Sequence, residues 1–507
     1  MENSRSRNAM RNVTAGIVYK ACSVCFPFVI RTLMIKNMGA EYLGLGSLFS
    51  SILQVLSLAE LGFGSAVVFS MYKPIVEHNN ELLCALYAFY RRVYRIIGIV
   101  VLMAGLLVIP ALPKLIQGSY PENINIYILY LIYLGNTVIS YWMYAYKESI
   151  LIAHQHSDIS SKIATISTLG MYIFQILTLI YIRNYYVYIF FLPASTILIN
   201  ILRAKIVDRM YPEIVCKGTL DTEMKKGLFK RIAGLLLYKL SGICRNSFDS
   251  IVLSAFLGLV VLAKYQNYYC IIAAIVAVLN IITDSITAGI GDSIASENVE
   301  KNYKDFNALY LIINWISSLC TTCLICLYQP FMALWVGKEY LFPFYMVIMF
   351  GIYFYSQQIG NVASTYRQAS GLWWEDKLRP VVESVANLVL NIVAVKYFGV
   401  VGVLMSTIIT IVFINIPWAS HILFKHYFKI DVKLYWFKIV VGIFPVILAA
   451  SLSYFLCAFL PGGGIISFFI KGVICFIISN LVLLIFYSKC KEFSRICAIV
   501  RRIFVKN

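Results

Sequence analysis

The chain has 507 residues, of which 60% are hydrophobic and only 13% are charged, and its mean hydropathy is +0.79. These values lie far outside the range of a water-soluble domain and predict an integral membrane protein. The net charge of +19 does not indicate a nucleic-acid partner, because basic residues of membrane proteins collect in cytoplasmic loops and against anionic lipid headgroups.

Apolar segments long enough to cross a bilayer, about 20 residues, recur along the whole chain. Charges, prolines and glycines mark their ends, and their continuous apolar length indicates helices. We therefore predict an all-α integral membrane protein with about fourteen transmembrane helices. The predicted spans are 13–35, 43–72, 89–113, 124–147, 162–182, 186–203, 231–257, 262–291, 306–329, 340–366, 380–396, 400–424, 434–460 and 464–488.

The positions of the basic residues predict the orientation of these spans. If the N-terminus is cytoplasmic, the external loops hold 7 of the 43 Lys and Arg residues, and the cytoplasmic segments hold 32. Short cytoplasmic loops are the ones that collect Lys and Arg. We therefore expect both termini in the cytoplasm. The remaining four basic residues, Lys20, Arg31, Lys239 and Arg245, fall within predicted spans.

Two halves of the sequence repeat each other. The stretch YKACSVCFPFVIRTLMIKNMGAEYL (19–43) matches YKLSGICRNSFDSIVLSAFLGLVVL (238–262) at five identical positions, each separated by 219 residues. ELGFGSAV then matches TAGIGDSI, and EHNNELLCALY matches EKNYKDFNALY, with separations of 223 to 227. Ordered matches of this kind indicate an internal duplication. We predict two six-helix bundles related by an axis along the membrane normal, followed by two further helices.

The duplication predicts how the chain is divided. An N-terminal bundle is expected over 1–207, a cytoplasmic linker over 208–230 and a second bundle over 231–425. Two additional spans with a basic cytoplasmic tail are expected over 434–507. Parallel repeats normally enclose a cavity and transport by rocking around it, so we expect an alternating-access transporter.

The predicted seventh span, AGLLLYKLSGICRNSFDSIVL (233–253), carries four polar residues in an apolar sequence. A charge at the bilayer centre costs at least about 2.5–3.5 kcal/mol unless it faces water or a partner. Lys239 and Asn246 are seven residues apart and Arg245 and Asp249 are an i,i+4 pair, so all four fit within one side of a helix. This pattern favours a cavity-facing stripe, in which Asp249 neutralises Arg245.

The repeat places Lys20 at the same depth as Lys239, and Arg31 lies on nearly the same face of the first span as Lys20. We interpret Lys20, Arg31, Lys239 and Arg245 as candidates for binding an anionic headgroup. Alternatively, Lys20 and Lys239 extend to the cytoplasmic interface and Arg31 to the outer one, since long basic side chains reach far along apolar surface.

Single acids lie near the middle of the second and eighth spans. Glu60, in LSLAELGFGSA, and Asp284, in NIITDSITAGIGDS, are candidates for carrying H+ or Na+, or counter-ions to the basic residues. Asn246 and Asp249 are grouped with them as supporting residues. The pairs Gly62/Gly64 and Gly289/Gly291 are expected to permit bending or close packing of helices.

Other classes of protein are disfavoured. Cys22/Cys25 and Cys320/Cys323/Cys326 have metal-like spacing, but they lie within predicted spans, where small apolar side chains on one helix face are expected. The sequence has no G-x-x-x-x-G-K-[ST] loop and no large loop for a catalytic domain. We therefore predict a transporter, with no catalytic residue, no bound metal and no cofactor apart from a coupling ion.

The run YLGLGSLFSSILQVLSLAELGFGSAVVFSMYKPIVEHNN, with the following YRRVYRIIG, resembles the bacterial polysaccharide and O-antigen repeat-unit flippase family. The resemblance is most specific over 8–100, and GIGDSIASENVEKNYKDF (289–306) resembles the corresponding part of the second half. That family belongs to the multidrug/oligosaccharidyl-lipid/polysaccharide exporter superfamily. Beyond residue 430 only the hydrophobic pattern agrees.

The resemblance implies a fourteen-helix transporter of the bacterial plasma membrane. Its substrate would be an isoprenoid diphosphate-linked oligosaccharide, turned from the cytoplasmic to the outer leaflet. The sequence leaves open whether the chain works alone or beside polysaccharide polymerase machinery. Lys and Arg suit a diphosphate as charge-assisted donors. The alternatives are a lipid II flippase, whose substrate also carries a lipid diphosphate, and a drug or metabolite extruder, for which an acidic cavity would be expected.

Overall fold

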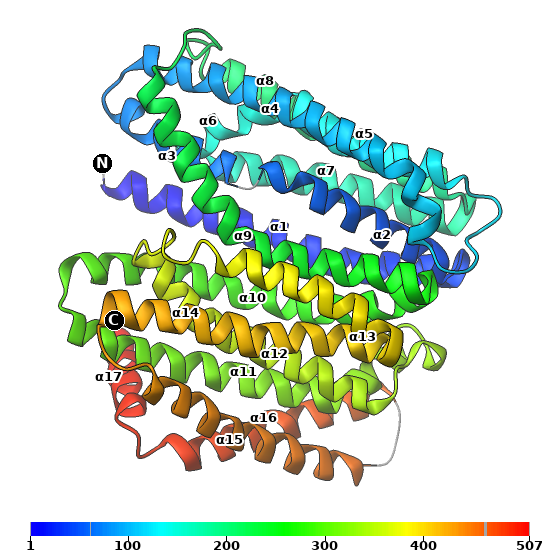
Figure 1. Cartoon of the computed structure of the whole chain (residues 1–507), viewed down its shortest axis with the longest axis vertical. Coiled ribbons are helices and arrows are strands. Elements are labelled where there is room, and N and C mark those ends of the chain that lie inside the picture. The colour runs from blue at the N-terminus through cyan, green and yellow to red at the C-terminus, as the bar shows by residue number, and fades with distance from the viewer. Residues whose placement is uncertain (1, 61, 461–463, 506–507) are drawn as a thin grey trace. The chain divides into compact units, whose positions relative to one another are not determined.

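The structure, a computed structural model, describes residues 2–60, 62–460 and 464–505 (Figure 1). The described residues form helices joined by loops and turns, with no strand among them, so the predicted all-α class is confirmed. The side chains of Lys239 and Asp284, two of the predicted site residues, lie outside the described part. Contacts divide the chain into two compact units, Met1–Ala263 and Lys264–Asn507.

The first unit is built from nine α-helices with short 3-10 or π segments between several of them. The α-helices are α1 (Glu2–Asn37), α2 (Ala40–Leu56), α3 (Phe63–Val76), α4 (Asn80–Val108), α5 (Ile126–Trp142), α6 (Glu148–Ala153), α7 (Ser157–Leu177), α8 (Tyr185–Met210) and α9 (Thr222–Leu257). The short segments are η1 (Ser57–Glu60), η2 (Ile109–Leu115), η3 (Ala145–Lys147) and η4 (Thr178–Ile182).

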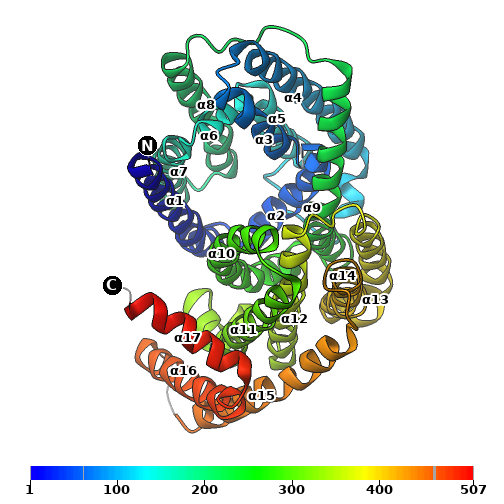
Figure 2. The same ribbon diagram turned by 90° about the vertical axis from the view of Figure 1, so that its left-hand side faces the viewer.

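The contacts between these helices close a ring. In order around it, α1 packs on α7, α7 on α8, α8 on α5, α5 on α4, α4 on α3, α3 on α9, α9 on α2, and α2 on α1. Figure 2 looks roughly along the helices and shows this arrangement. The short helix α6 contacts α3, α7 and α8. The ring includes α9, although the sequence-based division assigns this helix to the second bundle; that division stays a prediction.

The second unit contains the remaining helices. They are α10 (Leu259–Ser296), which begins at the end of the first unit, α11 (Val299–Trp335), α12 (Phe344–Ala369), α13 (Arg379–Thr410), α14 (Ile416–Leu423), α15 (Lys433–Ala458), α16 (Ile465–Tyr487) and α17 (Lys491–Val505). The short segments are η5 (Lys338–Tyr340), η6 (Ile411–Asn415) and η7 (Phe424–Phe428).

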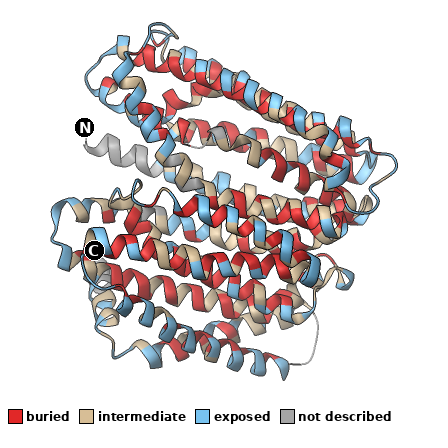
Figure 3. Cartoon of the chain, viewed as in Figure 1, coloured by how far each residue is buried: buried red, intermediate tan, exposed pale blue. Residues whose placement is uncertain are grey.

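Helix α11 is the centre of the second unit. It packs on α12, α15, α16 and α17, and 61% of its apolar span is buried, against 33% for α15 and 22% for α16. Figure 3 shows this concentration of buried residues along α11 and α12. The outer helices α15 and α16 therefore present most of their apolar surface outward, which a helix can do in lipid but not in water.

Nine of the described helical segments are long and apolar enough to span a membrane, or ten if the bent pair α5–α6 counts as one span. The chain is thus a multi-pass membrane protein. The continuous segment Arg379–Phe428 covers two predicted spans, because Gly399 breaks it with a positive φ of 56°. The predicted second span corresponds to the shorter helices α2 and α3 on either side of Gly62.

The repeat is visible in the ends of the helices. Gly39 and Gly258, aligned by the sequence match, both adopt a positive φ between consecutive helices. Asn79 caps α4 by accepting from the Leu82 amide, and Asn298 caps α11 by accepting from the Lys301 amide. These caps are also separated by 219 residues. The helix starts therefore keep a separation of 219. The buried runs that follow, Leu83–Tyr87 of α4 and Phe306–Tyr310 of α11, keep the separation of 223 that Glu77 and Glu300 predict.

Candidate functional site

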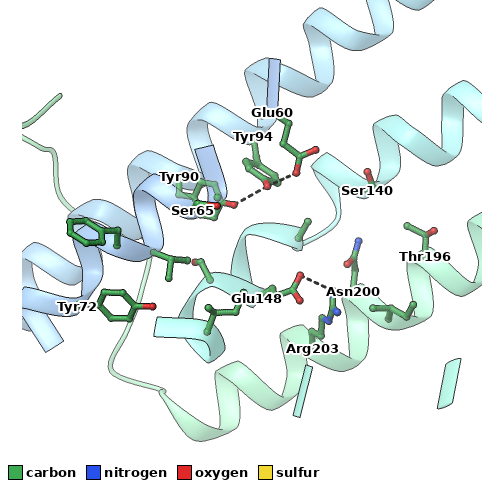
Figure 4. A pocket seen from close by; sticks show the side chains of 17 residues that line it. Glu60, Ser65, Tyr72, Tyr90, Tyr94, Ser140, Glu148, Thr196, Asn200 and Arg203 are labelled. Carbon is green, nitrogen blue, oxygen red and sulfur yellow. Dashed lines mark hydrogen bonds and ion pairs between the residues drawn. The ribbon is translucent and has the colours of Figure 1, made fainter. Parts of the chain in front are cut away.

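The first unit contains a polar cavity of about 700 Å³ (Figure 4). Residues from η1, α3, α4, α5, η3, α6 and α8 line it. The polar members are Glu60, Ser65, Tyr72, Tyr90, Tyr94, Ser140, Glu148, Ser149, Thr196, Asn200 and Arg203. The polar side chains of these segments therefore face one common space.

Glu60 ends a chain of hydrogen bonds on one side of the cavity. Tyr90 Oη donates to Tyr94 Oη at 2.8 Å, and Tyr94 Oη donates to Glu60 Oε1 at 2.7 Å. The Tyr141 hydroxyl also interacts with the Glu60 carboxylate. Among the described residues Glu60 forms no ion pair with a Lys or Arg. The described contacts of this carboxylate are therefore hydroxyl groups. A hydroxyl can donate a hydrogen bond to a carboxylate and accept one from a carboxylic acid.

Two glycines allow this arrangement. Gly62 separates η1 from α3 with a φ of 95°, a left-handed conformation that favours glycine because it has no Cβ. A Cβ on Gly64 would lie 3.0 Å from Tyr90 Oη. The expectation of bending and close packing is confirmed for this pair. Close packing is wrong for Gly289 and Gly291, where a Cβ would meet no described atom within 4 Å, and bending of α10 there stays a prediction.

A second polar group lies across the cavity, where α6 faces α8. Arg203 Nη1 donates to Glu148 Oε2 at 2.8 Å, and Ser160 Oγ donates to Glu148 Oε1 at 2.5 Å. Asn200, one turn before Arg203, is 5% exposed, and its Nδ2 has no hydrogen-bond partner in the described structure. A buried amide without a partner costs about 1–3 kcal/mol. Asn200 therefore marks a position where a guest could supply a hydrogen bond.

These groups suit two kinds of guest. Carboxylates, hydroxyls and amides together recognise a polyhydroxylated molecule through many directional bonds, with tyrosine faces as apolar platforms. Glu60 by itself is a candidate carrier of a proton or a small cation, because carboxylates within membrane spans commonly mark ion and proton pathways. The two uses are compatible within one cavity.

The described basic residues among the predictions, Lys20, Arg31 and Arg245, do not line this cavity. Lys20 is exposed on α1. Arg31 is half-buried on the same helix and lies near the Tyr188 hydroxyl of α8. Of the six predicted site residues whose side chains the structure describes, Glu60 alone lines the cavity. The headgroup role of the basic residues stays a prediction.

The predicted residues of the seventh span lie together on α9. Arg245 is 8% exposed and Asp249 is 2% exposed, and Asn246 is partly buried. Between them, Ser247 Oγ donates to Gln54 Oε1 of α2 at 3.1 Å. Polar residues of α9 therefore lie within the ring of the first unit, at the contact of α9 with α2. Their role in binding an anion is not tested by this placement.

Sequence reasoning missed Glu148, Asn200 and Arg203. Glu148 follows the break after α5, and the predicted fourth span ended just before it. Arg203 falls at the end of the predicted sixth span and was counted as a cytoplasmic charge. The available signal was Glu148 just after the fourth predicted span and Arg203 at the end of the sixth. Only the fold shows that these two side chains form an ion pair.

The second unit contains an apolar groove of about 730 Å³. Side chains of α11, α12, η6, α14 and α15 line it, and they are mainly aliphatic or aromatic. Ile352 of α12 and Val440 and Ile447 of α15 are 45%, 66% and 58% exposed, so the groove is accessible from outside the unit. Such a surface suits a hydrocarbon chain.

Four buried charged side chains of the second unit bind one another in a closed network. Asp376 accepts from Arg379 at 2.8 Å and pairs with Arg367 at 2.6 Å, and Arg379 donates to Glu383 at 2.9 Å. Asn415 of η6 also donates to Glu383 at 2.8 Å. The four charged side chains are at most 3% exposed. This network ties α12, α13 and η6 together.

Comparisons with known proteins agree with the fold. No family model matches the sequence, and no curated protein does. The lipid II flippase MurJ, in an inward closed conformation, superposes with a TM-score of 0.64 at 16% identity, over 94% of this chain and 98% of MurJ. An inward-facing multidrug resistance MATE transporter of the MOP superfamily gives 0.61 at 16% identity, over 78% and 93%.

A MATE transporter of Vibrio cholerae gives a TM-score of 0.56 at 15% identity, over 85% of this chain and 98% of the transporter. At these identities the likeness shows the fold alone. MOP abbreviates the exporter superfamily that the sequence resembles. The chain therefore has the fold shared by the MurJ flippase and the MATE transporters of the MOP superfamily.

Proposed function

We propose that the chain is a flippase that moves an isoprenoid diphosphate-linked oligosaccharide repeat unit from the cytoplasmic to the outer leaflet of the bacterial plasma membrane, for surface polysaccharide assembly. It works by alternating access and an ion gradient drives it. The substrate is an amphiphile with a hydrocarbon chain, an anionic diphosphate and a sugar head. A transporter for it needs both an apolar and a polar surface.

The apolar groove of the second unit is the observation that carries this proposal. An isoprenoid chain offers no hydrogen bonds, so only buried apolar area holds it, at about 25 cal/mol per Å². The groove is lined by exposed aliphatic side chains of α12 and α15. Helix α15 lies beyond the twelve helices of the predicted duplication. In this proposal the added helix supplies one wall of the groove that holds the isoprenoid chain.

The polar cavity of the first unit supports the remaining parts. Its hydroxyl, amide and carboxylate groups suit a sugar head, and Glu60 is the candidate carrier for H+ or Na+. The diphosphate is assigned to Lys20, Arg31, Lys239 and Arg245, as the sequence predicts, because charge-assisted bonds to phosphate are strong.

A lipid II flippase is the second candidate. The MurJ match spans 94% of this chain, against 78% and 85% for two MATE transporters, and MurJ is a flippase for lipid II. A lipid II flippase would use the same apolar groove. A drug extruder would not need it, although the two acids Glu60 and Glu148 of the polar cavity agree with the acidic cavity expected of an extruder.

The groove provides the experiment. Val440 of α15 lines it and Val441 does not, while both are more than half exposed. In a strain lacking the gene, Val440→Asn should reduce surface polysaccharide and accumulate lipid-linked precursor on the cytoplasmic face, whereas Val441→Asn should export normally. Placing an asparagine amide in lipid costs about the same free energy at Val440 and at Val441. A difference in export between the two variants therefore reports on the groove and not on insertion in the membrane.

Equal export by the two variants, at equal amounts in the membrane, would contradict the role of the groove. Rescue of a strain that lacks its lipid II flippase would select the second candidate. Efflux of organic cations that is unaffected by both substitutions would select the extruder.

A further inference from the structure

Three buried cysteines from three helices meet in the second unit. Cys326 of α11, Cys457 of α15 and Cys475 of α16 are 7%, 4% and 0% exposed. Their Sγ atoms all lie within 4.8 Å of one another. A fourth cysteine, Cys323, is half-buried one turn before Cys326 and hydrogen-bonds to Cys475. The sequence suggested only the pairs within α11, because the other two helices are far away in the chain.

The distances fit metal coordination. Three sulfurs bound to one ion at about 2.3 Å would lie about 4 Å apart, so the present spacing needs only a small contraction. Cys457 Sγ donates a long hydrogen bond of 3.9 Å to the Lys471 carbonyl oxygen, which any metal would replace. The side chains that surround the cluster are apolar, chiefly Leu327 and Ile474.

The donors define the class of ion. The group contains sulfur only, without an imidazole or a carboxylate. Thiolates select soft ions such as Cu(I), whereas hard cations prefer oxygen. Zinc in structural sites takes four tetrahedral ligands. Three sulfurs are mutually close here, and the fourth thiol, Cys323, hydrogen-bonds to Cys475 but lies outside that group. A three-sulfur group therefore favours a monovalent soft ion.

We propose that Cys326, Cys457 and Cys475 form a binding site for Cu(I) that joins α15 and α16 to α11. The ion replaces thiol protons, which leave to water, and no electron is transferred. Lys471, one turn before Cys475 and partly buried, supplies a compensating positive charge within the same helix. Since protons are released, the affinity for Cu(I) should rise with pH. The site does not depend on the transported substrate.

The test uses the full-length protein, purified in detergent under anaerobic reducing conditions. Cu(I) is titrated against a chromogenic Cu(I) chelator, and the bound ion is examined by X-ray absorption. We expect one high-affinity ion per chain, a sulfur-only coordination shell, and a higher unfolding temperature with Cu(I), because an ion that binds only the folded state stabilises it.

Three variants, Cys326→Ser, Cys457→Ser and Cys475→Ser, should each lose this ion and the thermal shift. Cys84→Ser and Cys244→Ser replace buried cysteines of the first unit and should lose neither. Because a serine can disturb packing, a variant that retains only Cys323, Cys326, Cys457 and Cys475 is also titrated. It should keep the one ion.

Failure of that variant to bind Cu(I) would overturn the proposal, as would unchanged binding in the three single variants. A tighter zinc site with four sulfur ligands would overturn the assignment to Cu(I). All these readouts are independent of transport, so they are separate from the proposed flippase function.

Discussion

The two units of the molecule treat polar groups in opposite ways. In the first unit, Glu60, Glu148 and Arg203 line a cavity, and the amide of Asn200 is left without a partner in the described structure. In the second, Arg367, Asp376, Arg379 and Glu383 bind one another in a closed network, and the accessible groove is apolar. Buried charge is thus held in a closed network in the second unit, whereas charged groups line a cavity in the first.

This difference teaches that a charge within a span is weak evidence of function until its partners are known. A buried charge must be paired or face water. The two halves meet this requirement differently: charges face a cavity in the first and pair in a network in the second. Their helix starts nevertheless stay 219 residues apart. Duplication conserves the helices, while the polar groups diverge.

The largest expected effect comes from opening the closed network. Asp376→Asn leaves two arginines facing a single acid, Glu383, in a buried site. Removing one partner of a buried pair costs about 3–5 kcal/mol. We expect a much lower unfolding temperature in detergent and less protein in the membrane, measured by fluorescence-detected gel filtration.

The exposed pair Lys301–Glu297 is the control, with side chains 43% and 42% exposed. Lys301→Met should change stability by less than about 1 kcal/mol. If Asp376→Asn is as stable as Lys301→Met, the contrast between the units is wrong.

The next effect concerns transport. Glu60→Gln keeps a hydrogen-bond acceptor for Tyr94 but cannot bind or release a proton. We expect near-normal stability and a loss of gradient-driven flipping of about 10- to 100-fold, the equivalent of a charged hydrogen bond of about 1.5–3 kcal/mol. Flipping is measured in proteoliposomes with an imposed ion gradient.

Glu60→Asp keeps the carboxylate and should retain part of the activity. In the second unit, Glu383→Gln should lower the unfolding temperature, because Glu383 belongs to the buried network. Any loss of flipping by this variant should follow from that loss of stability. Gradient-driven flipping by Glu60→Gln at the normal rate would remove Glu60 as the carrier.

The smallest effect is a pH dependence at α17. Burial alone would raise the pKa of Glu492, but the Lys438 ammonium, which donates to it at 2.8 Å, outweighs burial and holds the pKa below its ordinary value of 4.5. The bond therefore contributes stability above that value and loses it as the pH falls through the lowered pKa. Hydrogen exchange in α17 should accelerate below about pH 4.

In Lys438→Met this acceleration should disappear, because the pKa of Glu492 returns toward its ordinary value. The pair Arg495–Asp305, at 2.6 Å, holds α17 to α11 in both proteins. The same profile in the variant and the parent would contradict the role of Lys438.

Much of the fold could be predicted because lipid imposes long apolar helices, and Lys and Arg mark their ends. The break at Gly399 and the turn at Arg183 before α8 fell within the expected gaps. The helix α17 was expected only as a basic tail, since its length is too short for a span. Its contacts with α11 depend on Asp305 and Trp315, which the sequence does not connect to it.

The site was less predictable for a physical reason. Spacing reveals which residues share one helix face, as for Arg245 and Asp249, but not which face meets another helix. Glu148 and Arg203 are 55 residues apart, and the cysteines of the second unit come from three helices. Such groups become visible only when the packing is known.

The closure of the first ring by α9 has a consequence for biosynthesis. Until the ribosome has produced residues up to Leu257, the sides of α2 and α3 that α9 covers have no protein neighbour. An insertion factor or chaperone has its best opportunity at that stage. For co-expression of two fragments, a cut at Gly258, between α9 and α10, preserves the ring, whereas a cut in the loop 211–221 separates α9 from the helices that it seals.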